Sequence, residues 1–452
     1  MEQVNKILSD ISSFIWGPPL LILLVGTGIF LTFRLLFLQF HALPFALKQT
    51  FISHDKHNHE GDVSHFAALM TALSATIGTG NIAGVATAVV LGGPGAVFWM
   101  WITALVGMAT KYAECLLAVK FRTTNSKGEM SGGPMYYIEN GLGKNWKWLA
   151  ILFALFGTLA SFGIGSSVQA NAVASAVEQS FGINTAICGA TLTVLTAIVV
   201  LGGIKSIARA ASIIVPLMAI FYVVGGIIII SLHLELVGKA FMLIVNDAFT
   251  GQAVEGAVLG TAVRYGVARG LFSNEAGLGS APIAAAAAKT DHPVRQALVS
   301  MTGTFLDTIV VCSITGLVLV IGYISAENSF GELKGAALTT AYFNNLMPGP
   351  GGWIVAFGLI FFAYSTILGW CYYGEKCAGY LLGEKAVLPY RIIYTLTVMA
   401  GAVLSLDLVW NLADIFNGLM AIPNLIALLL LSNVVARETK DFVKRRRTGE
   451  LY

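Results

Sequence analysis

Eleven apolar stretches, most of about 20 residues or more, follow one another along this chain with short connections. A helix needs about 20 apolar residues to cross the hydrocarbon of a bilayer, and lipid cannot satisfy an open backbone, so these stretches can cross only as helices. Charged residues make up 11% of the 452 residues, against about 25% in soluble proteins. The chain is therefore expected to form one all-α membrane domain. The expected transmembrane helices lie near 16–38, 64–90, 95–119, 147–181, 185–204, 210–231, 257–287, 296–323, 352–382, 388–405 and 408–434.

Basic residues concentrate in alternate loops between these helices. If the C-terminus is cytoplasmic, the cytoplasmic loops hold 21 of the 27 Lys and Arg residues, the outer loops hold three, and three lie within spans. This bias follows the positive-inside rule. It predicts a multi-pass protein of the plasma (cell inner) membrane with its N-terminus outside. The basic cytoplasmic tail, 435–452, is suited to contact with anionic lipid.

The second and seventh expected helices share a pattern of glycine and polar residues at their middles. A shift of 193 positions aligns these two patterns, which indicates an internal duplication. The aligned pairs are Asn81 with Asn274, Ala83 with Ala276, Gly84 with Gly277, Thr87 with Ser280, and Ala88 with Ala281.

The duplication predicts a five-plus-five inverted repeat. Residues 64–231 form the first repeat and residues 257–434 form the second. Because each repeat has an odd number of helices, the second enters the membrane from the opposite side. Residues 1–40 hold one extra N-terminal helix outside the repeat.

The glycines predict that both patterned helices unwind at mid-membrane, because glycine leaves helical geometry easily. Freed N–H groups attract an anion and freed carbonyls attract a cation, so the pair suits an amino-acid zwitterion together with Na⁺. Close helix packing through small residues is the alternative. Asn81 and Asn274 could also cap the broken ends without touching a substrate. The glycines are Gly78, Gly80, Gly270 and Gly277.

The same residues resemble a known family. Residues 71–86 are similar to the first motif of the alanine or glycine:cation symporters, and further similarity covers 92–101, Glu114, 132–137 and 272–282. The resemblance spans almost the whole chain. It implies sodium- or proton-coupled uptake of alanine or glycine on the inverted-repeat fold of the bacterial leucine transporter.

The resemblance also implies where the substrate binds. Its carboxylate would meet the first interruption, and its amino group would meet opened carbonyls at the second. Gln169 is a candidate ligand or a packing residue, and Trp370 lies at mid-span, where it can wall a pocket for a small side chain. The candidate substrate-binding residues are Gly78, Thr79, Gly80, Asn81, Gln169, Gly270, Phe272, Ser273, Asn274 and Trp370.

By the same resemblance, a sodium site joins the second and ninth helices. Na⁺ is a hard cation that takes about five or six oxygen ligands, although adjacent hydroxyls in a helix can instead bond the preceding turn. Asp307 and Thr308 are candidates for a second ion site. The sodium candidates are carbonyls near Ser74, Ala75, Ile77 and Gly78, with the hydroxyls of Ser365 and Thr366.

Charged residues inside spans are functional candidates. Glu275 is expected to hold the second interruption open by accepting backbone N–H bonds. Arg264 and Arg269 are expected to form an outer gate with an acidic partner. Lys111 and Glu114 are expected to form a gate or interface pair near the cytoplasmic side.

The predicted function is sodium-coupled symport of a small neutral amino acid by alternating access, with no cofactor besides the coupling ion and no obligatory protein partner. A proton-coupled carrier or exchanger on the same fold is the alternative. The sequence contains no nucleotide-binding or catalytic motif, so an enzyme is not expected. A nucleic-acid partner is not expected either. The histidines of the first cytoplasmic loop have irregular spacing, which favours solvation over a metal site. They are His54, His57, His59 and His65.

Overall fold

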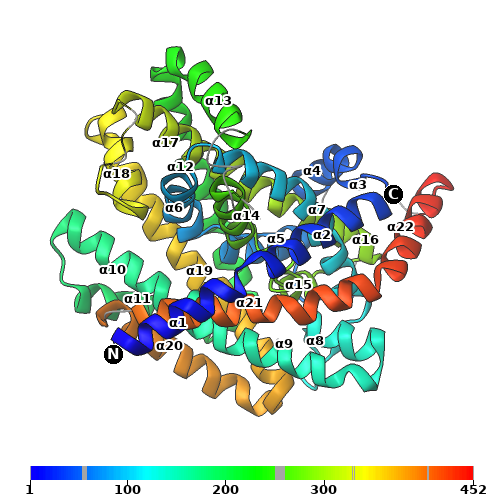
Figure 1. Ribbon diagram of the computed structural model, residues 1–452. Helices are drawn as coiled ribbons and strands as arrows, with labels where there is room; N and C mark the ends of the chain where they lie inside the picture. Colours follow the sequence, from blue (N-terminus) through cyan, green and yellow to red (C-terminus); the bar gives the residue numbers. More distant parts are fainter. Residues whose placement is uncertain are drawn as a thin grey trace.

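The computed structural model describes residues 2–52, 59–249, 260–327, 329, 331–404 and 407–450 (Figure 1). Almost all of these residues are helical. One antiparallel hairpin pairs β1, Thr123–Thr124, with β2, Met130–Ser131. The expected seventh span begins at 257, and this edge falls outside the described residues.

The α-helices differ in length from single turns to more than 30 residues. They are α1 Glu2–Ile15, α2 Pro18–Arg34, α3 Leu38–His41, α4 Leu43–Phe51, α5 His65–Thr76, α6 Ala83–Gly92, α7 Ala96–Lys120, α8 Pro134–Tyr137, α9 Lys147–Ala160, α10 Val168–Phe181, α11 Thr185–Val200, α12 Gly203–Leu232, α13 Leu234–Phe249, α14 Thr261–Asn274, α15 Ala281–Ala285, α16 Pro293–Thr304, α17 Ser313–Ser325, α18 Gly335–Leu346, α19 Pro350–Leu382, α20 Val387–Val403, α21 Asp407–Leu430 and α22 Ser432–Arg447. Short 3-10 and π segments are η1 Thr79–Asn81, η2 Ile138–Leu142, η3 Lys144–Trp146, η4 Ser161–Ser167, η6 Phe305–Cys312 and η7 Glu384–Ala386.

Eight helices in the described part of the chain are long and apolar enough to cross a membrane, and a bent pair makes a ninth. The bent pair joins α5 to η1 and α6 through a 61° change of direction. The apolar helix α11 is shorter, with 16 residues. Helices α14 and α15 are separated by residues 275–280. The structure therefore supports a multi-pass helical membrane protein.

The first expected span differs in its bounds from the prediction. The helix begins at Glu2, bends at Trp16 and Gly17, and ends at Arg34 instead of 38. The bend follows from the residues after it, because Pro18 and Pro19 start α2 without N–H groups to continue α1. Helix α1 packs along α21, while the N and C ends of the chain lie on opposite sides of the molecule (Figure 1).

Helix packing defines two groups that meet at the middle of the molecule. In the first group, α7 packs against α14, α15 and α16. In the second group, α19 packs against α9, α10 and α12. Helix α5 contacts both groups through α12, α16 and α19. The break at the end of α5 therefore lies between the two groups.

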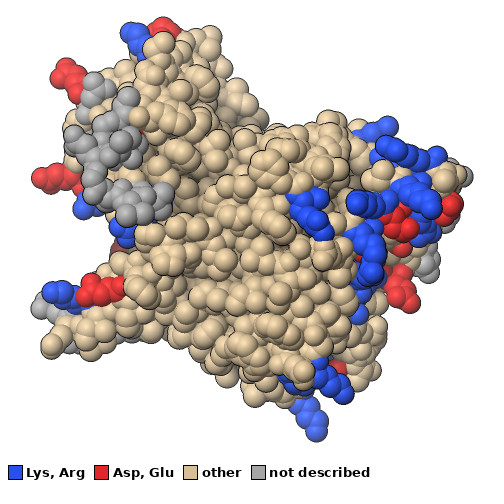
Figure 2. Space-filling model, turned by 45° about the vertical axis from the view of Figure 1, so that its right-hand side comes forward, with Lys and Arg blue, Asp and Glu red and all other residues tan. Residues whose placement is uncertain are grey.

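The surface carries a wide band of uncharged side chains. Figure 2 shows this band between an end where Lys and Arg gather and an opposite end with few charges. Exposed apolar residues also lie on helices α11 and α12, such as Ile198, Ile213 and Leu217, which are more than 60% exposed. Apolar side chains exposed on this scale are those expected at contact with lipid.

Candidate functional site

The first helix break lies at residues 77–82, as the sequence predicts. Helix α5 ends at Thr76, Ile77 and Gly78 have extended backbone, and a single 3-10 turn over Thr79–Asn81 follows. All of these residues are buried. The last carbonyls of α5 and the first N–H groups after the break have no helical partner, so both kinds of backbone dipole are concentrated there.

The second break lies a few residues later than the sequence predicts. Helix α14 continues through Gly270, Phe272 and Ser273, and ends at Asn274. The prediction of opened backbone around Gly270 is therefore wrong. Gly270 serves close packing instead, because a β-carbon there would lie 2.5 Å from Thr103 Oγ1 and 3.2 Å from Met100 Cα on α7.

The second break itself runs from Glu275 to Ser280. Glu275 has a left-handed backbone with φ of 54°. Gly277 and Gly279 have φ of 92° and 84°. This left-handed region favours glycine, because glycine has no β-carbon. The first break faces the end of α14 that leads into the second break, since a β-carbon on Gly80 would lie 3.4 Å from Ser273 Cα.

Both predicted asparagines cap the break that they belong to. The Gly78 N–H donates to Asn81 Oδ1 at 2.9 Å, and the Ala276 N–H donates to Asn274 Oδ1 at 3.0 Å. The capping alternative considered from the sequence is thus present in the structure. Each side-chain amide nitrogen then donates to the π segment η6, Asn81 to Asp307 and Asn274 to Thr308.

Asp307 joins the two breaks. It is fully buried on η6 and accepts from Asn81 Nδ2 at 2.7 Å, from Ser273 Oγ at 3.0 Å and from Thr308 Oγ1 at 2.8 Å. Hydrogen bonds to an ionised carboxylate are about twice as strong as neutral ones. One side chain therefore holds both the first break and the end of α14 against η6.

An oxygen cluster lies between the end of α5 and the middle of α19. Ser365 Oγ donates to Ser74 O at 3.2 Å, and Thr366 Oγ1 donates to Ile77 O at 3.4 Å. A β-carbon on Gly78 would lie 2.5 Å from Thr366 Oγ1. The structure thus brings the predicted sodium candidates together. Ala75 is also near, since a β-carbon on Gly369 of α19 would lie 2.7 Å from its nitrogen.

The same two hydroxyls also bond their own helix. Ser365 and Thr366 each donate to Phe362 O, at 2.9 and 3.0 Å. A hydroxyl has one hydrogen and two lone pairs, so each can alternate between these carbonyls or accept with its lone pairs. Hydroxyl oxygens beside free carbonyls are the donor type that Na⁺ takes, by analogy with other hard cations.

Gln169 and Trp370 border the first and second breaks respectively. Gln169 Nε2 donates to Ile164 O at 3.0 Å, while its Oε1 has no hydrogen-bond partner among the described residues and would lie 3.6 Å from a β-carbon on Gly78. Trp370 is 2% exposed and its indole N–H donates to Glu275 Oε1 at 3.0 Å. Gln169 thus directs a free acceptor toward the break.

Glu275 differs from its predicted role. Its carboxylate accepts from two side chains, Ser280 Oγ at 2.5 Å and the Trp370 indole, where backbone N–H groups were expected. Glu275 therefore ties the second break to α19.

A second buried acid, Glu114 on α7, holds the far side of the second break. Its Oε1 accepts from the Gly279 N–H at 3.2 Å and from Asn424 Nδ2 at 2.6 Å. Asn424 Nδ2 also donates to Gly277 O at 2.8 Å. Lys111 Nζ is buried and has no hydrogen-bond partner in the described part of the chain, so it makes no hydrogen bond to Glu114 there. The hydrogen bonds of Glu114 link α7 to the second break and to α21. Asn424 was not identified from the sequence.

A small cavity is lined in part by Phe272. It has a volume of about 150 Å³. Arg264, Arg269 and Asp414 line it, and the Arg269 guanidinium lies 5.7 Å from the centre of the Phe272 ring. Asp414 of α21 thus lines the same cavity as the two arginines of the predicted outer gate.

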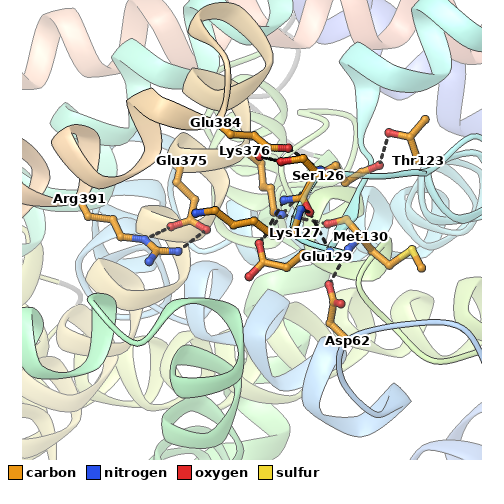
Figure 3. A network of polar contacts seen from close by, with 12 residues as sticks. Asp62, Thr123, Ser126, Lys127, Glu129, Met130, Glu375, Lys376, Glu384 and Arg391 are labelled. Atoms are coloured by element: carbon orange, nitrogen blue, oxygen red, sulfur yellow. Dashed lines mark hydrogen bonds and ion pairs between the residues drawn. The ribbon is translucent and has the colours of Figure 1, made fainter.

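A larger cavity of about 570 Å³ lies near the C-terminal end of α19 and the N-terminal end of α20. Figure 3 shows the polar network that borders it. Arg391 forms a two-pronged pair with Glu375, with Nε to Oε2 at 2.6 Å and Nη2 to Oε1 at 3.1 Å. Lys376 Nζ donates to Met130 O at 2.9 Å. These bonds link the hairpin to the end of α19.

The hairpin turn is fixed by a second contact. The Ser126 N–H donates to Glu384 Oε1 at 2.7 Å, and Ser126 Oγ donates to the other oxygen of the same carboxylate. At the base of the hairpin, the Met130 N–H donates to Asp62 Oδ2 at 2.9 Å. The hairpin therefore covers one side of the 570 Å³ cavity.

Within the described residues, no group of three or more His, Cys, Asp or Glu side chains is arranged to hold a metal ion. His54 and His57 of the first loop lie outside those residues. His65 Nδ1 lies 2.6 Å from Gln296 Oε1.

Comparisons with known proteins agree on one family. The sequence profile of the sodium:alanine symporter family matches residues 1–451. The sodium/alanine symporter AgcS of Methanococcus maripaludis is 60% identical over 444 residues, which are 98% of each chain. An uncharacterized transporter of Haemophilus influenzae is 57% identical over 448 residues, 98% of this chain and 97% of its own. The crystal structure of MhsT in complex with L-phenylalanine has a TM-score of 0.58 at 16% identity and covers 84% of this chain and 98% of MhsT. This likeness shows the leucine-transporter-like fold.

Proposed function

The chain belongs to the sodium:alanine symporter family, and we propose that it is a sodium-coupled symporter that takes up a small neutral amino acid, alanine or glycine. The relative of Methanococcus maripaludis that is 60% identical is named for sodium and alanine. The two helix breaks supply the free N–H and C=O groups that a zwitterion needs at mid-membrane.

We assign the substrate carboxylate to the first break. The N–H groups of Thr79 and Gly80 follow the end of α5, beside the Gly78 N–H that donates to Asn81. The free Oε1 of Gln169 is suited to accept from the substrate amino group. The amino group lies toward the last carbonyls of α14, at Phe272 and Ser273, because the final carbonyls of a helix lack helical partners. Asn81 and Asn274 shape the site through their caps.

Trp370 limits the size of the substrate side chain in this proposal. The ring is buried and fixed at both ends, by the hydrogen bond to Glu275 and by Gly165, where a β-carbon would lie 2.3 Å from Trp370 Cβ. A wall fixed in this way tolerates a methyl group better than a branched chain, since packed interiors resist added volume.

The oxygen cluster between α5 and α19 is the proposed sodium site. Carbonyls near Ser74, Ala75, Ile77 and Gly78 would act with the hydroxyls of Ser365 and Thr366. This cluster is the observation that carries the coupling proposal, because it adjoins the first break. An ion bound there would draw α19 toward the same backbone that receives the substrate.

We further propose eleven spans in a five-plus-five inverted repeat, with the N-terminus outside and the C-terminus cytoplasmic. Helix α11 and the pair α14–α15 would supply the spans that length alone leaves out. Each repeat also carries a buried acid that bonds the other repeat, Glu114 in the first and Asp307 in the second. These two acids are 193 positions apart, which is the same shift that aligns the two patterned helices. The Lys and Arg residues at one end of Figure 2 support the orientation.

Alternating access then requires closures on both sides of the site. The Arg269 and Asp414 side chains border the outer cavity, and the hairpin with Glu375, Lys376 and Arg391 borders the cytoplasmic one. We propose that these groups separate and re-form as the site opens to one side and then to the other. A proton-coupled carrier on the same fold is the alternative, with Asp307 as the proton-accepting group.

Uptake of radiolabelled alanine into proteoliposomes tests the proposal. A sodium gradient should drive accumulation, while a pH gradient without sodium should not. Thr366→Val should raise the half-saturating sodium concentration about tenfold or more, equivalent to about 1.4 kcal/mol, because it deletes a ligand oxygen.

Thr158→Val is the matched control for this substitution. Thr158 Oγ1 donates to Ala154 O at 2.8 Å within α9, so it shares the bond to its own helix without the contact to α5. Equal sodium dependence of both variants would argue against the proposed ion site. Accumulation driven by protons alone would favour the alternative carrier.

A further inference from the structure

A groove of about 470 Å³ lies where α2 ends, between the bend 35–41 and helix α22. Its volume is within the range of about 300–1,000 Å³ typical of ligand sites. The surface of the groove is mostly apolar, with a basic rim. The lining residues are Arg34, Leu35, Leu36, Leu38, His41, Ala436, Thr439, Lys440, Val443, Lys444, Arg447 and Thr448.

The charges of α22 are separated onto different faces of the helix. Lys440, Lys444 and Arg447 line the groove at spacings of three and four residues, which places them on one face. The acidic residues point elsewhere: Glu438 pairs with Lys120 at 2.8 Å, and Asp441 lies 3.7 Å from His292. Among the described residues, the groove lining therefore carries basic side chains and no acidic one.

Arg34 completes the rim from the opposite wall. It is the last residue of α2, and its guanidinium donates to Asn433 Oδ1 at the start of α22. This bond holds the guanidinium near the groove mouth. Cations thus approach the same space from both α2 and α22.

The bend below the rim presents apolar side chains outward. Leu36 and Phe37 have left-handed backbones with φ of 55° and 58°, which is unusual for bulky residues. Leu36 is 75% exposed and Phe33 is 62% exposed. The rings of Phe33, Phe37 and Phe40 lie in series, with centroids 5.1 and 6.3 Å apart. Side chains of this kind are stable where they meet acyl chains.

We propose that this groove binds one anionic glycerophospholipid, with its phosphate at the basic rim and its acyl chains along the Leu36 and Phe33 side of α2. The charge of the rim complements a phosphate, and the apolar floor continues directly into the lipid-facing surface of a span. A soluble phosphate compound would leave that floor exposed. The site is separate from the substrate path and stands whether or not the proposed substrate is correct.

Native mass spectrometry of the detergent-purified full chain tests this site. Phosphatidylglycerol and phosphatidylcholine with the same acyl chains are added in turn. We expect one phosphatidylglycerol to bind at least tenfold more tightly than phosphatidylcholine. The triple variant Lys440→Gln, Lys444→Gln, Arg447→Gln should lose this preference.

The triple variant Lys144→Gln, Lys205→Gln, Arg437→Gln is the charge-matched control. These residues are exposed and lie outside the groove, and Arg437 is on the same helix α22. The control should keep the preference. Arg34→Gln leaves the sequence of α22 unchanged and should by itself weaken the preference for phosphatidylglycerol. A weaker preference in this variant could not be explained by substitutions that misfold α22.

Three results would overturn the proposal. If the groove variant and the control variant lost the preference for phosphatidylglycerol equally, the lipid would be held by the overall positive charge of the surface and not by the groove. Equal binding of the two lipids would mean that the rim recognises no anion. Displacement of phosphatidylglycerol by a tenfold excess of glycerol phosphate would mean that the groove takes a soluble phosphate compound.

Discussion

Three hydrogen bonds converge on the buried carboxylate of Asp307, from Asn81, Ser273 and Thr308. All three donors are buried; Asn81 belongs to the first break and Ser273 to the end of α14, just before the second break. A buried donor that loses its acceptor costs about 1–3 kcal/mol. The geometry of the first break and of the end of α14 therefore depends on this one side chain.

Asp307→Asn should reduce alanine uptake at least tenfold. The amide supplies one oxygen where the carboxylate supplies two, so either Asn81 or Ser273 loses its acceptor. Uptake into proteoliposomes and thermal unfolding are measured together. Glu332→Gln, at an exposed acid, should change neither quantity. Unchanged uptake by the Asp307→Asn variant would contradict a positioning role for Asp307.

Gly165→Ala should lower the maximal rate of uptake about tenfold or more. The new β-carbon would lie 2.3 Å from Trp370 Cβ, so the indole must move from its hydrogen bond with Glu275. Gly84→Ala is the matched control, because a β-carbon there meets no described atom within 4 Å. A rate for Gly165→Ala equal to that of the control would show that Trp370 does not shape the site.

Residue types and spacing predicted the first break but misplaced the second. Gly78 and Gly270 look alike in sequence, yet Gly78 lies in extended backbone and Gly270 lies within α14 against α7. A glycine in an apolar stretch serves either unwinding or close packing. The choice depends on a neighbouring helix that is distant in sequence, so one chain alone does not specify it.

At the scale of elements, α16 begins with a histidine cap. His292 Nδ1 accepts from the Val294 N–H at 3.2 Å, and Pro293 follows at the first helical position. Burial lowers the pKa of His292 below its usual range. The cap requires a neutral ring, because a protonated Nδ1 cannot accept a hydrogen bond.

Acidification should therefore loosen the start of α16. The unfolded chain binds a proton below about pH 6.5, whereas the folded chain resists it, so the stabilisation is complete above that pH and is lost as the pH falls further. The nearby charges are Asp291, Glu438, Asp441 and Arg445.

His292→Asn tests the cap, since Asn accepts the same N–H without titrating in this range. The drop in melting temperature between about pH 7.5 and about pH 5.5, on either side of the usual histidine pKa, should be smaller in His292→Asn than in the unaltered protein. His41→Asn, at an exposed histidine, should leave the drop unchanged. An identical drop in all three proteins would exclude His292 as a source of acid sensitivity.

The lengths of the apolar stretches predicted the positions of most helices. They did not predict the hydrogen bonds between helices. The sequence placed Ser365 and Thr366 near the carbonyls of Ser74 and Ile77 only through a family resemblance. The bond from Asn424 to Glu114 joins residues 310 positions apart. Such pairs leave no local pattern, because each partner alone resembles an ordinary polar residue in a span.

At the scale of the molecule, the hairpin turn joins η7 beside the 570 Å³ cavity. Ser126→Cys with Glu384→Cys should allow a short bifunctional thiol reagent to lock this contact. Uptake should stop on cross-linking and recover on cleavage of the linker, since the proposed cycle requires the hairpin to separate from η7. The five native cysteines are buried and should not compete.

Each single-cysteine variant, treated in the same way, is the control for cross-linking. Full uptake by the cross-linked double variant would mean that the hairpin stays in place throughout the cycle. The substrate path would then leave the molecule elsewhere.

Each of the two proposed repeats carries a buried acid that bonds a segment of the other repeat, and this has a further consequence. Glu114 bonds a helix end in the second repeat, and Asp307 bonds one in the first. A chain cut to a single repeat would keep its acid but lose the helix end that the acid stabilises. Half-length versions should therefore become ordered only when two of them associate head to tail, each completing the other.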